Sequence, residues 1–201
     1  MTSTEPQTSI PTDHPIARRI TDVLEPKNWL LVITLVVGWH ADRLAGIAWG
    51  LIAGVFSAVL PILWIKWGEK RGHWGDRHIR RRQDRLIVIP GIMVSVLAGI
   101  ALMVVFDAPR EVLALILAMM ASLIVFMAVT AVWKISFHTA VPAGAVAVAA
   151  LIYGPWALTV CALIVVIGWS RVVLKDHTLA QVLAGAAAGG SIAACVFTLM
   201  R

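Results

Sequence analysis

Seven long apolar stretches constrain this chain more than any other feature. They lie at about residues 27–40, 43–67, 86–106, 111–133, 139–153, 156–170 and 178–200. Stretches this long and uniform are typical of membrane-spanning helices, because a backbone inside a bilayer must satisfy its polar groups internally. They are too long and too continuous for the strands of a membrane barrel. The sequence therefore predicts an all-α fold, a polytopic membrane helix bundle.

The composition and the turns agree with this fold. Hydrophobic residues make up 60% of the 201 residues and charged residues only 14%, and the mean hydropathy is +0.87. Three stretches have only about 14 to 16 residues, near the shortest length that crosses a bilayer, so we expect six or seven transmembrane helices. Short turns with breaker residues at 38–43, 107–111 and 153–155 predict that the helices pair as hairpins.

The chain divides into two parts. Residues 1–26 are polar and contain several Thr and Pro residues, which predicts a flexible N-terminal tail. Residues 27–201 contain all the apolar stretches and are expected to form a single transmembrane domain.

Basic residues mark one side of the predicted bundle. Because each hairpin returns the chain to the side it left, segments 68–85, 134–138 and 170–177 share one face. That face, with the segment before residue 28, carries 14 of the 17 Lys and Arg residues, and only Arg43, Arg110 and Arg201 lie opposite. The positive-inside rule predicts that the shared face is cytoplasmic in a cell-membrane protein. Nucleic-acid binding is not expected, because no soluble domain presents these charges.

Three polar clusters converge on the shared face. They read HIRRRQDR at 78–85, KISFHT at 134–139 and SRVVLKDHTLAQ at 170–181. Guanidinium groups bind phosphate oxygens in bidentate fashion and stay charged at physiological pH. Histidine acts as a nucleophile toward phosphorus or as a general acid. Together these residue types predict a site for phosphoryl transfer.

The third cluster contains the best candidate for a nucleophile. His177 opens the last apolar stretch, and Gln181 lies four residues later, on the same face of a helix. A side-chain acceptor at this spacing fixes the tautomer of the imidazole and leaves the other ring nitrogen able to attack. Ser170 and Arg171 end the preceding stretch, and a short loop brings them over the same pocket.

The three clusters resemble the signature of the type 2 phosphatidic acid phosphatase superfamily, which comprises membrane lipid phosphate phosphatases. That signature is K-x6-R-P, then P-S-G-H, then S-R-x5-H-x3-D. In the third part Ser170, Arg171 and His177 match at the required spacing, whereas Gln181 stands where the family has aspartate. The resemblance covers roughly residues 66–190.

The first two parts of the signature match less closely. In the second part Ser136 and His138 are kept, but isoleucine and phenylalanine replace the proline and the glycine. In the first part His78 falls at the lysine position and Arg85 at the arginine position. Leu86 replaces the proline that follows it.

The resemblance implies roles for these residues. His177 would attack phosphorus to form a phosphohistidine, and His138 would protonate the leaving alcohol and then activate water. Further residues would hold the phosphate oxygens, namely Arg85, Ser136, Arg171, His78, Lys134 and Ser170. The family mechanism needs no metal or cofactor, and the acidic residues near the clusters lack ligand spacing with the histidines.

The function expected from the resemblance is that of an integral-membrane phosphatase. Its substrate would be a lipid phosphate or diphosphate drawn from the bilayer, such as an isoprenoid (di)phosphate, a prenyl-sugar phosphate, or phosphatidic or phosphatidylglycerol phosphate. A neutral Gln181 cannot stabilise a cationic imidazole as a carboxylate does. The alternative is therefore a non-hydrolytic protein that binds or scaffolds lipid phosphates.

Overall fold

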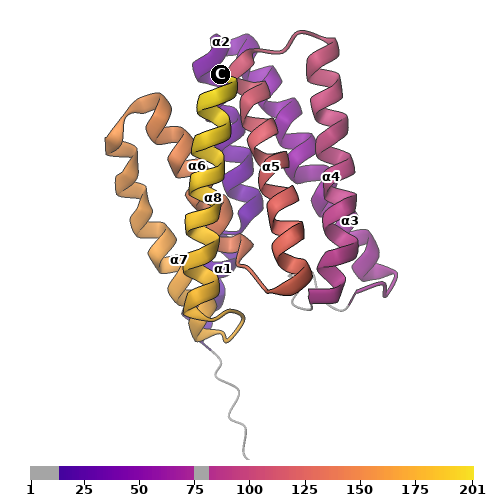
Figure 1. Ribbon diagram of the computed structural model, residues 1–201, viewed down its shortest axis with the longest axis vertical. Coiled ribbons are helices and arrows are strands. Elements are labelled where there is room, and N and C mark those ends of the chain that lie inside the picture. Colours follow the sequence, from indigo (N-terminus) through magenta and orange to yellow (C-terminus); the bar gives the residue numbers. More distant parts are fainter. Residues whose placement is uncertain (1–13, 75–81) are drawn as a thin grey trace, which may run out of the picture.

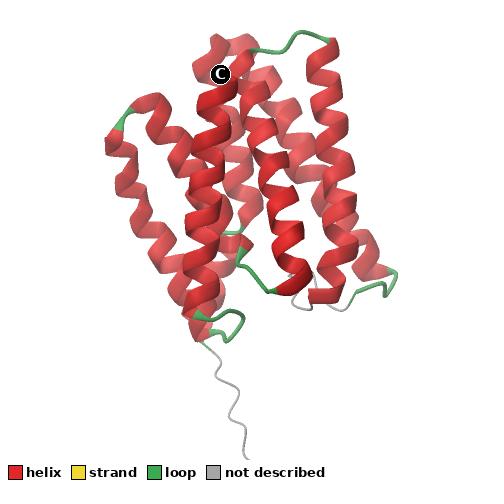
Figure 2. Ribbon diagram, in the orientation of Figure 1, coloured by secondary structure: helices red, strands yellow, loops and turns green. Residues whose placement is uncertain are grey.

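The protein is an all-α bundle. The computed structural model describes residues 14–74 and 82–201, and over these ranges it contains helices and no strand (Figures 1 and 2). The elements are α1 (Pro15–Val23), α2 (Pro26–Gly54), the π-helix η1 (Val55–Val59), α3 (Leu60–Lys70), α4 (Arg82–Val105), α5 (Arg110–Val132), α6 (Phe137–Tyr153), the 3₁₀ helix η2 (Pro155–Val160), α7 (Cys161–Val173) and α8 (Leu179–Met200). The predicted fold class is confirmed at this level.

Several of these helices have transmembrane character. Within the described ranges, five helical segments are long and apolar enough to cross a bilayer: Pro15–Lys70, Asp84–Val105, Arg110–Val132, Pro155–Val173 and Leu179–Met200. Helix α6 is equally apolar but shorter, with 17 residues. Large apolar side chains are exposed along these helices, as expected of surfaces that face lipid.

Helix α2 reverses direction within its length. Asp42 (φ −153°, ψ 47°) and Arg43 (φ 42°, ψ −120°) leave the helical conformation. On either side of this point the two halves of α2 meet at glycines, and a Cβ atom on Gly38 would lie 2.3 Å from the carbonyl oxygen of Gly46. The two halves therefore pack antiparallel as the expected hairpin.

The π-helix η1 forms a polar contact inside the apolar bundle. A π-turn frees backbone carbonyls from the regular α-helical pattern. The carbonyl oxygen of Phe56 accepts a hydrogen bond from Ser95 Oγ of α4 at 2.6 Å. This bond ties the η1–α3 segment to α4 along the wall of the cavity described below.

The core lies among α2, α4, α5, α6 and α8. Its fully buried side chains include Val37, Met103, Ile116, Val148 and Phe197. Helix α7 lies outside this core, where it packs against α1, α6 and α8. Its Val165 is 72% exposed, which marks the outward face of α7 as a lipid-facing surface.

The prediction of a flexible tail over residues 1–26 is wrong for its second half. Residues 15–23 form α1, which packs against α7. Ala17 and Thr21 are buried, and their spacing of four residues places them on one face of the helix. Helix α2 then begins at Pro26. Residues 1–13 lie outside the described part of the chain.

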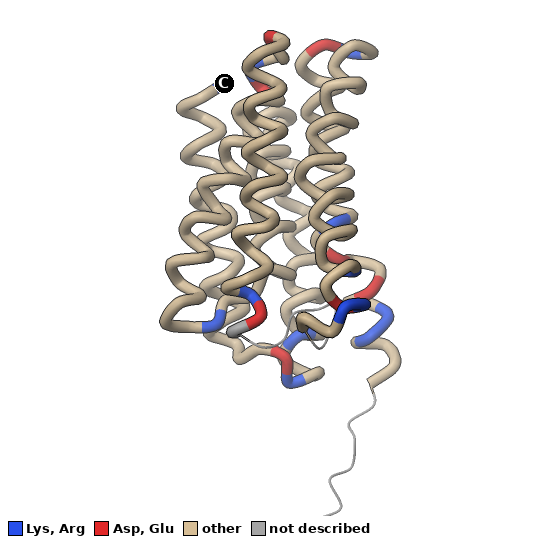
Figure 3. The backbone as a smooth tube through the Cα atoms, turned by 90° about the vertical axis from the view of Figure 1, so that its right-hand side faces the viewer, with Lys and Arg blue, Asp and Glu red and all other residues tan. Residues whose placement is uncertain are grey.

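One end of the bundle collects most of the charge. Figure 3 shows Lys, Arg, Asp and Glu gathered near the end that carries α1, with a smaller group at the opposite end. The end of α3, the start of α4 and the loops α5–α6 and α7–α8 lie at the α1 end, and the C-terminus lies at the other (Figure 1). We call these the charged end and the far end.

Candidate functional site

Hydrogen bonds at the charged end join the three polar clusters. Arg85 Nη1, at the start of α4, donates to the carbonyl oxygen of Ile135 at 2.8 Å. Lys134 Nζ, in the α5–α6 loop, donates to the carbonyl oxygen of Asp176 at 2.6 Å. Segments separated by 50 and 42 residues are thus held together by side chains that the sequence singled out.

The α5–α6 loop also packs closely on α8. The backbone N–H of Ser136 donates to the carbonyl oxygen of Gln181 at 3.3 Å. Gly185, one helical turn later, makes this approach possible, because a Cβ there would lie 2.4 Å from the carbonyl oxygen of Ser136 and 2.8 Å from Thr139 Oγ1. The absence of a side chain at residue 185 therefore brings the second cluster against the third.

Gln181 holds His177 in one orientation and one tautomer. Its Oε1 lies 3.1 Å from His177 Nδ1 and 3.2 Å from the backbone nitrogen of Thr178. The Thr178 N–H can only donate, which identifies this atom of Gln181 as the amide oxygen. An amide oxygen only accepts, so Nδ1 carries the proton and Nε2 has the lone pair. The predicted contact is present, within a capping box that starts α8.

The surroundings of His177 keep its ring neutral. Burial, together with the nearby cations Arg85, Lys134 and Arg171, lowers the pKa of His177 to about 3, although the hydrogen bond to Gln181 acts in the opposite direction. Both burial and cations disfavour a charged imidazole. The unprotonated form of Nε2 is therefore available at physiological pH.

The guanidinium of Arg171 is buried and held from two sides. Its Nη2 forms an ion pair of 2.8 Å with Asp176 Oδ2, and both side chains are less than 10% exposed. Its Nη1 lies 3.5 Å from Thr21 Oγ1, which belongs to α1. Arg171 and Asp176 are close in sequence, whereas Thr21 reaches the site from the other end of the chain.

Ser170, predicted to hold phosphate, has its hydroxyl bound to other residues of the protein. Its hydroxyl is completely buried and donates to the carbonyl oxygen of Ile167 at 2.7 Å, within its own helix. Its Oγ also lies 3.1 Å from Thr21 Oγ1. A hydroxyl has a single proton to donate, and here Ser170 donates it to the backbone of its own helix. The role of Ser170 toward phosphate stays a prediction.

Ser136 remains a good candidate ligand. Its hydroxyl oxygen is fully buried and has no hydrogen-bond partner among the residues that the structure describes. Buried polar atoms are nearly always paired, so an unpaired hydroxyl at this position favours a ligand oxygen as its partner. His138, two residues later in the first turn of α6, is also buried, with 9% of its side chain exposed.

The aromatic ring of Phe137 lies beside the guanidinium of Arg85. The guanidinium carbon of Arg85 lies 5.5 Å from the centre of the Phe137 ring, a cation–π distance. The same ring packs edge-on against Phe126 at 5.1 Å. The Phe137 ring thus forms an apolar platform beside a buried cation.

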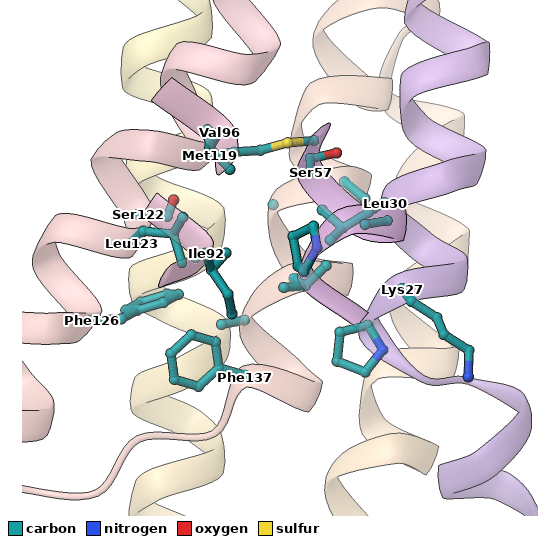
Figure 4. Close-up of a pocket in the computed structure, with 18 of the residues that line it drawn as sticks. Lys27, Leu30, Ser57, Ile92, Val96, Met119, Ser122, Leu123, Phe126 and Phe137 are labelled. Carbon is teal, nitrogen blue, oxygen red and sulfur yellow. The ribbon is translucent and has the colours of Figure 1, made fainter. Parts of the chain in front are cut away.

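An apolar cavity of about 320 Å³ begins at the site and runs into the bundle. His138, Arg85 and Phe137 line it near the charged end, and Val96, Met119 and Val148 line its deep part. Figure 4 shows its walls, with Phe126 and Phe137 toward one end and Ser57 and Met119 toward the other. His138 lines this cavity, whereas His177 and Arg171 do not.

The remaining points concern His78 and the residues that could hold a metal ion. His78 falls within residues 75–81, outside the described part of the chain. Among the described residues there is no group of three or more His, Cys, Asp or Glu arranged to hold a metal ion. The sequence did not point to Thr21, because its contact with Ser170 spans 149 residues of the chain.

Comparisons with known proteins identify no relative of this chain. No family model, no curated protein and no solved structure matches this chain. The assignment of function therefore depends on the residues and geometry of the site.

Proposed function

We propose that this protein is an integral-membrane phosphatase that hydrolyses a lipid phosphate or diphosphate through a phosphohistidine intermediate. One observation carries the proposal: His177 is buried and neutral, its ring is oriented by Gln181, and the cations Arg85, Lys134 and Arg171 lie near it. The order of motifs in the sequence, which resembles the type 2 phosphatidic acid phosphatases, points to the same chemistry.

In the first step Nε2 of His177 attacks the phosphorus atom. A bond forms between nitrogen and phosphorus, and the bond between phosphorus and the leaving oxygen breaks. The electron pair goes to that oxygen, which takes a proton from His138. The alcohol leaves, and the phosphoryl group stays on His177.

In the second step water replaces the enzyme nitrogen. His138, now unprotonated, accepts a proton from water as the water oxygen attacks phosphorus. The bond between nitrogen and phosphorus breaks, which releases inorganic phosphate and restores neutral His177. Arg85, Arg171 and Ser136 stabilise the negative charge that develops on the phosphoryl oxygens in both steps. Lys134 adds positive charge beside them, and its ammonium group also holds the α7–α8 loop.

The cavity supports a lipid as the leaving alcohol. The residue assigned to protonate the leaving oxygen, His138, lines the cavity, so a chain attached to that oxygen can extend into it. Beyond Arg85 and His138 the walls are largely apolar, with Ile92, Val96 and Leu123 among them. An apolar cavity of this kind suits a hydrocarbon chain and offers little to a sugar or a nucleoside.

Release of inorganic phosphate tests the proposal directly. Purified protein in detergent is incubated with phosphatidic acid, phosphatidylglycerol phosphate and isoprenoid (di)phosphates, each without added metal. We expect turnover with at least one lipid, and we expect His177→Ala to reduce the rate by about 10⁴-fold or more, as for removal of other catalytic nucleophiles. Unchanged turnover in His177→Ala would refute the assignment.

A non-hydrolytic lipid-phosphate binding protein is the second candidate, and Gln181 is the observation that favours it. A neutral amide orients the imidazole but cannot stabilise the cationic form that develops when nitrogen bonds to phosphorus. This candidate predicts that the wild type binds lipid phosphate without releasing phosphate. It also predicts that Gln181→Asp gains activity.

We further propose that the bundle crosses the membrane seven times, with the charged end in the cytoplasm. The reversal at residues 42–43 divides Pro15–Lys70 into two passes, and α6 supplies a short one. The excess of Lys and Arg at the charged end supports its cytoplasmic placement. In a variant without Cys161 and Cys195, Lys70→Cys should resist impermeant thiol reagents on intact cells, whereas Asp107→Cys should react. The reverse pattern would overturn this orientation.

A further inference from the structure

We propose that Thr21 positions Arg171, so that helix α1 completes the phosphate site. This inference rests on the proposed function, because it takes Arg171 as a phosphate ligand. Thr21 is separated from Arg171 by 150 residues, and it belongs to a helix that the sequence alone assigned to a tail. Its contribution is a hydroxyl group delivered to the back of a buried guanidinium.

The contacts of Thr21 are buried and specific. Thr21 is 3% exposed, and its partners Ser170 and Arg171 are 0% and 2% exposed. Thr21 Oγ1 lies 3.1 Å from Ser170 Oγ and 3.5 Å from Arg171 Nη1. A threonine in a short terminal helix is ordinarily exposed. Here it reaches the interior of the charged end.

The direction of these hydrogen bonds follows from the number of protons. Ser170 donates its only hydroxyl proton to the carbonyl oxygen of Ile167, so Ser170 Oγ accepts the proton of Thr21. Thr21 Oγ1 is then oriented with a lone pair toward Arg171 Nη1, which donates. The chain of bonds runs from Arg171 through Thr21 and Ser170 to the backbone of α7. Valine at residue 21 would keep the shape and remove both bonds.

Thr21 and Asp176 fix the guanidinium plane between them. Asp176 binds Nη2 and Thr21 binds Nη1, so the two contacts determine both the position and the rotation of the group. Bidentate binding of phosphate depends on this rotation. Thr21 is neutral, so it orients Arg171 without reducing the positive charge that attracts phosphate.

Helix α1 is built to deliver this residue. Ala17 is fully buried one turn before Thr21, and its small side chain lets α1 approach α7 closely. Ile16 and Val23 are 68% and 66% exposed on other faces of the helix. A helix with one small buried face and apolar residues elsewhere can lie at the membrane interface while it holds Thr21 inward.

Binding of inorganic phosphate to the full chain in detergent tests the inference, with calorimetric titration as the measurement. Thr21→Val should weaken phosphate binding by about tenfold, within the range for the loss of one hydrogen bond to a charged group. Thr21→Ser keeps the hydroxyl and should bind nearly as the wild type does. Thr34→Val is the matched control, because Thr34 is a buried threonine whose hydroxyl bonds within its own helix. Arg171→Ala shows how much phosphate binding is lost when the guanidinium itself is removed.

The outcomes separate this inference from the proposed function. Wild-type binding in Thr21→Val, or equal weakening in Thr21→Ser, would overturn the positioning role. If the wild type binds phosphate and Thr21→Val weakens that binding, but no lipid is hydrolysed, the positioning role stands and the phosphatase proposal fails. If phosphate does not bind to the wild type, or Arg171→Ala binds it equally well, both are wrong.

Discussion

Both ends of the bundle carry charged side chains, but they differ in whether those side chains are exposed or buried. At the far end Asp42, Arg43, Asp107 and Arg110 are exposed to solvent, and Arg43 stacks over Trp39 at 5.1 Å. At the charged end Arg85, Arg171, His138 and His177 are buried. Burying a cation costs free energy unless a partner compensates, so an end that only marks topology has no reason to do so. The contrast supports the proposal of a binding site at the charged end.

The largest expected effect separates the two ends directly. Arg171→Ala should reduce phosphate release by about 10²- to 10³-fold, because it removes a donor that stabilises transition-state charge. Arg43→Ala, at the far end, should leave the rate unchanged, since its side chain is exposed and its main contact is Trp39. Rates are measured with the best lipid substrate in the same detergent. Equal losses of phosphate-release rate in both variants would contradict the proposed difference between the two ends.

A smaller effect tests whether close backbone packing builds the charged end. Gly185→Ala should destabilise the fold by about 1–3 kcal/mol, the usual range for overpacking, since its Cβ would meet the carbonyl oxygen of Ser136 at 2.4 Å. Gly190→Ala, on the same helix, is the control, because the nearest atom to its Cβ is 3.7 Å away. Thermal unfolding in detergent measures both. Equal unfolding temperatures in the two variants would show that the loop adapts freely.

The smallest effect concerns the pH dependence within the site. His177 has a pKa lowered to about 3, so its neutral form persists as the pH falls, and the wild-type rate should show no acid limb from His177 above about pH 4. Gln181→Glu keeps the length of the side chain and adds a negative charge, which raises a neighbouring histidine pKa by about 1–3. The acid limb should therefore move to higher pH.

The control for this change is Gln181→Met, which keeps the volume and removes the acceptor. It should lower the rate at every pH without creating a new limb. A pH–rate profile that is identical in Gln181→Glu and the wild type would mean that His177 is not the titrating nucleophile.

Much of the fold could be predicted from the sequence, because membrane-spanning helices are recognised by their length and hydropathy. The hairpin in α2 and the shared placement of the three clusters were predicted from breaker residues and basic residues. The π-helix η1 and the 3₁₀ helix η2 were not predicted. Such turns depend on tertiary contacts, such as the hydrogen bond from Ser95 to the carbonyl oxygen of Phe56. No hydropathy pattern reports such a contact.

The site was predicted in its residue types and less well in its partners. His177 and Gln181 lie four residues apart, and their contact is local, so helical geometry alone predicted it. Ser170 was predicted to hold phosphate, and only the structure shows that its hydroxyl donates a hydrogen bond to the carbonyl oxygen of Ile167. Thr21 could not be inferred, because a contact across 149 residues leaves no trace in a single sequence.

The oxygen of Gln181 links the reactivity of His177 to the fraying of a helix end. The same Oε1 accepts from His177 and from the backbone that starts α8. When the first turn of α8 opens, as helix ends do locally and often, the imidazole loses its orientation at the same moment. Under the proposed mechanism, the fraction of molecules able to react then equals the fraction in which this turn is closed. Warming would reduce that fraction before any global unfolding begins.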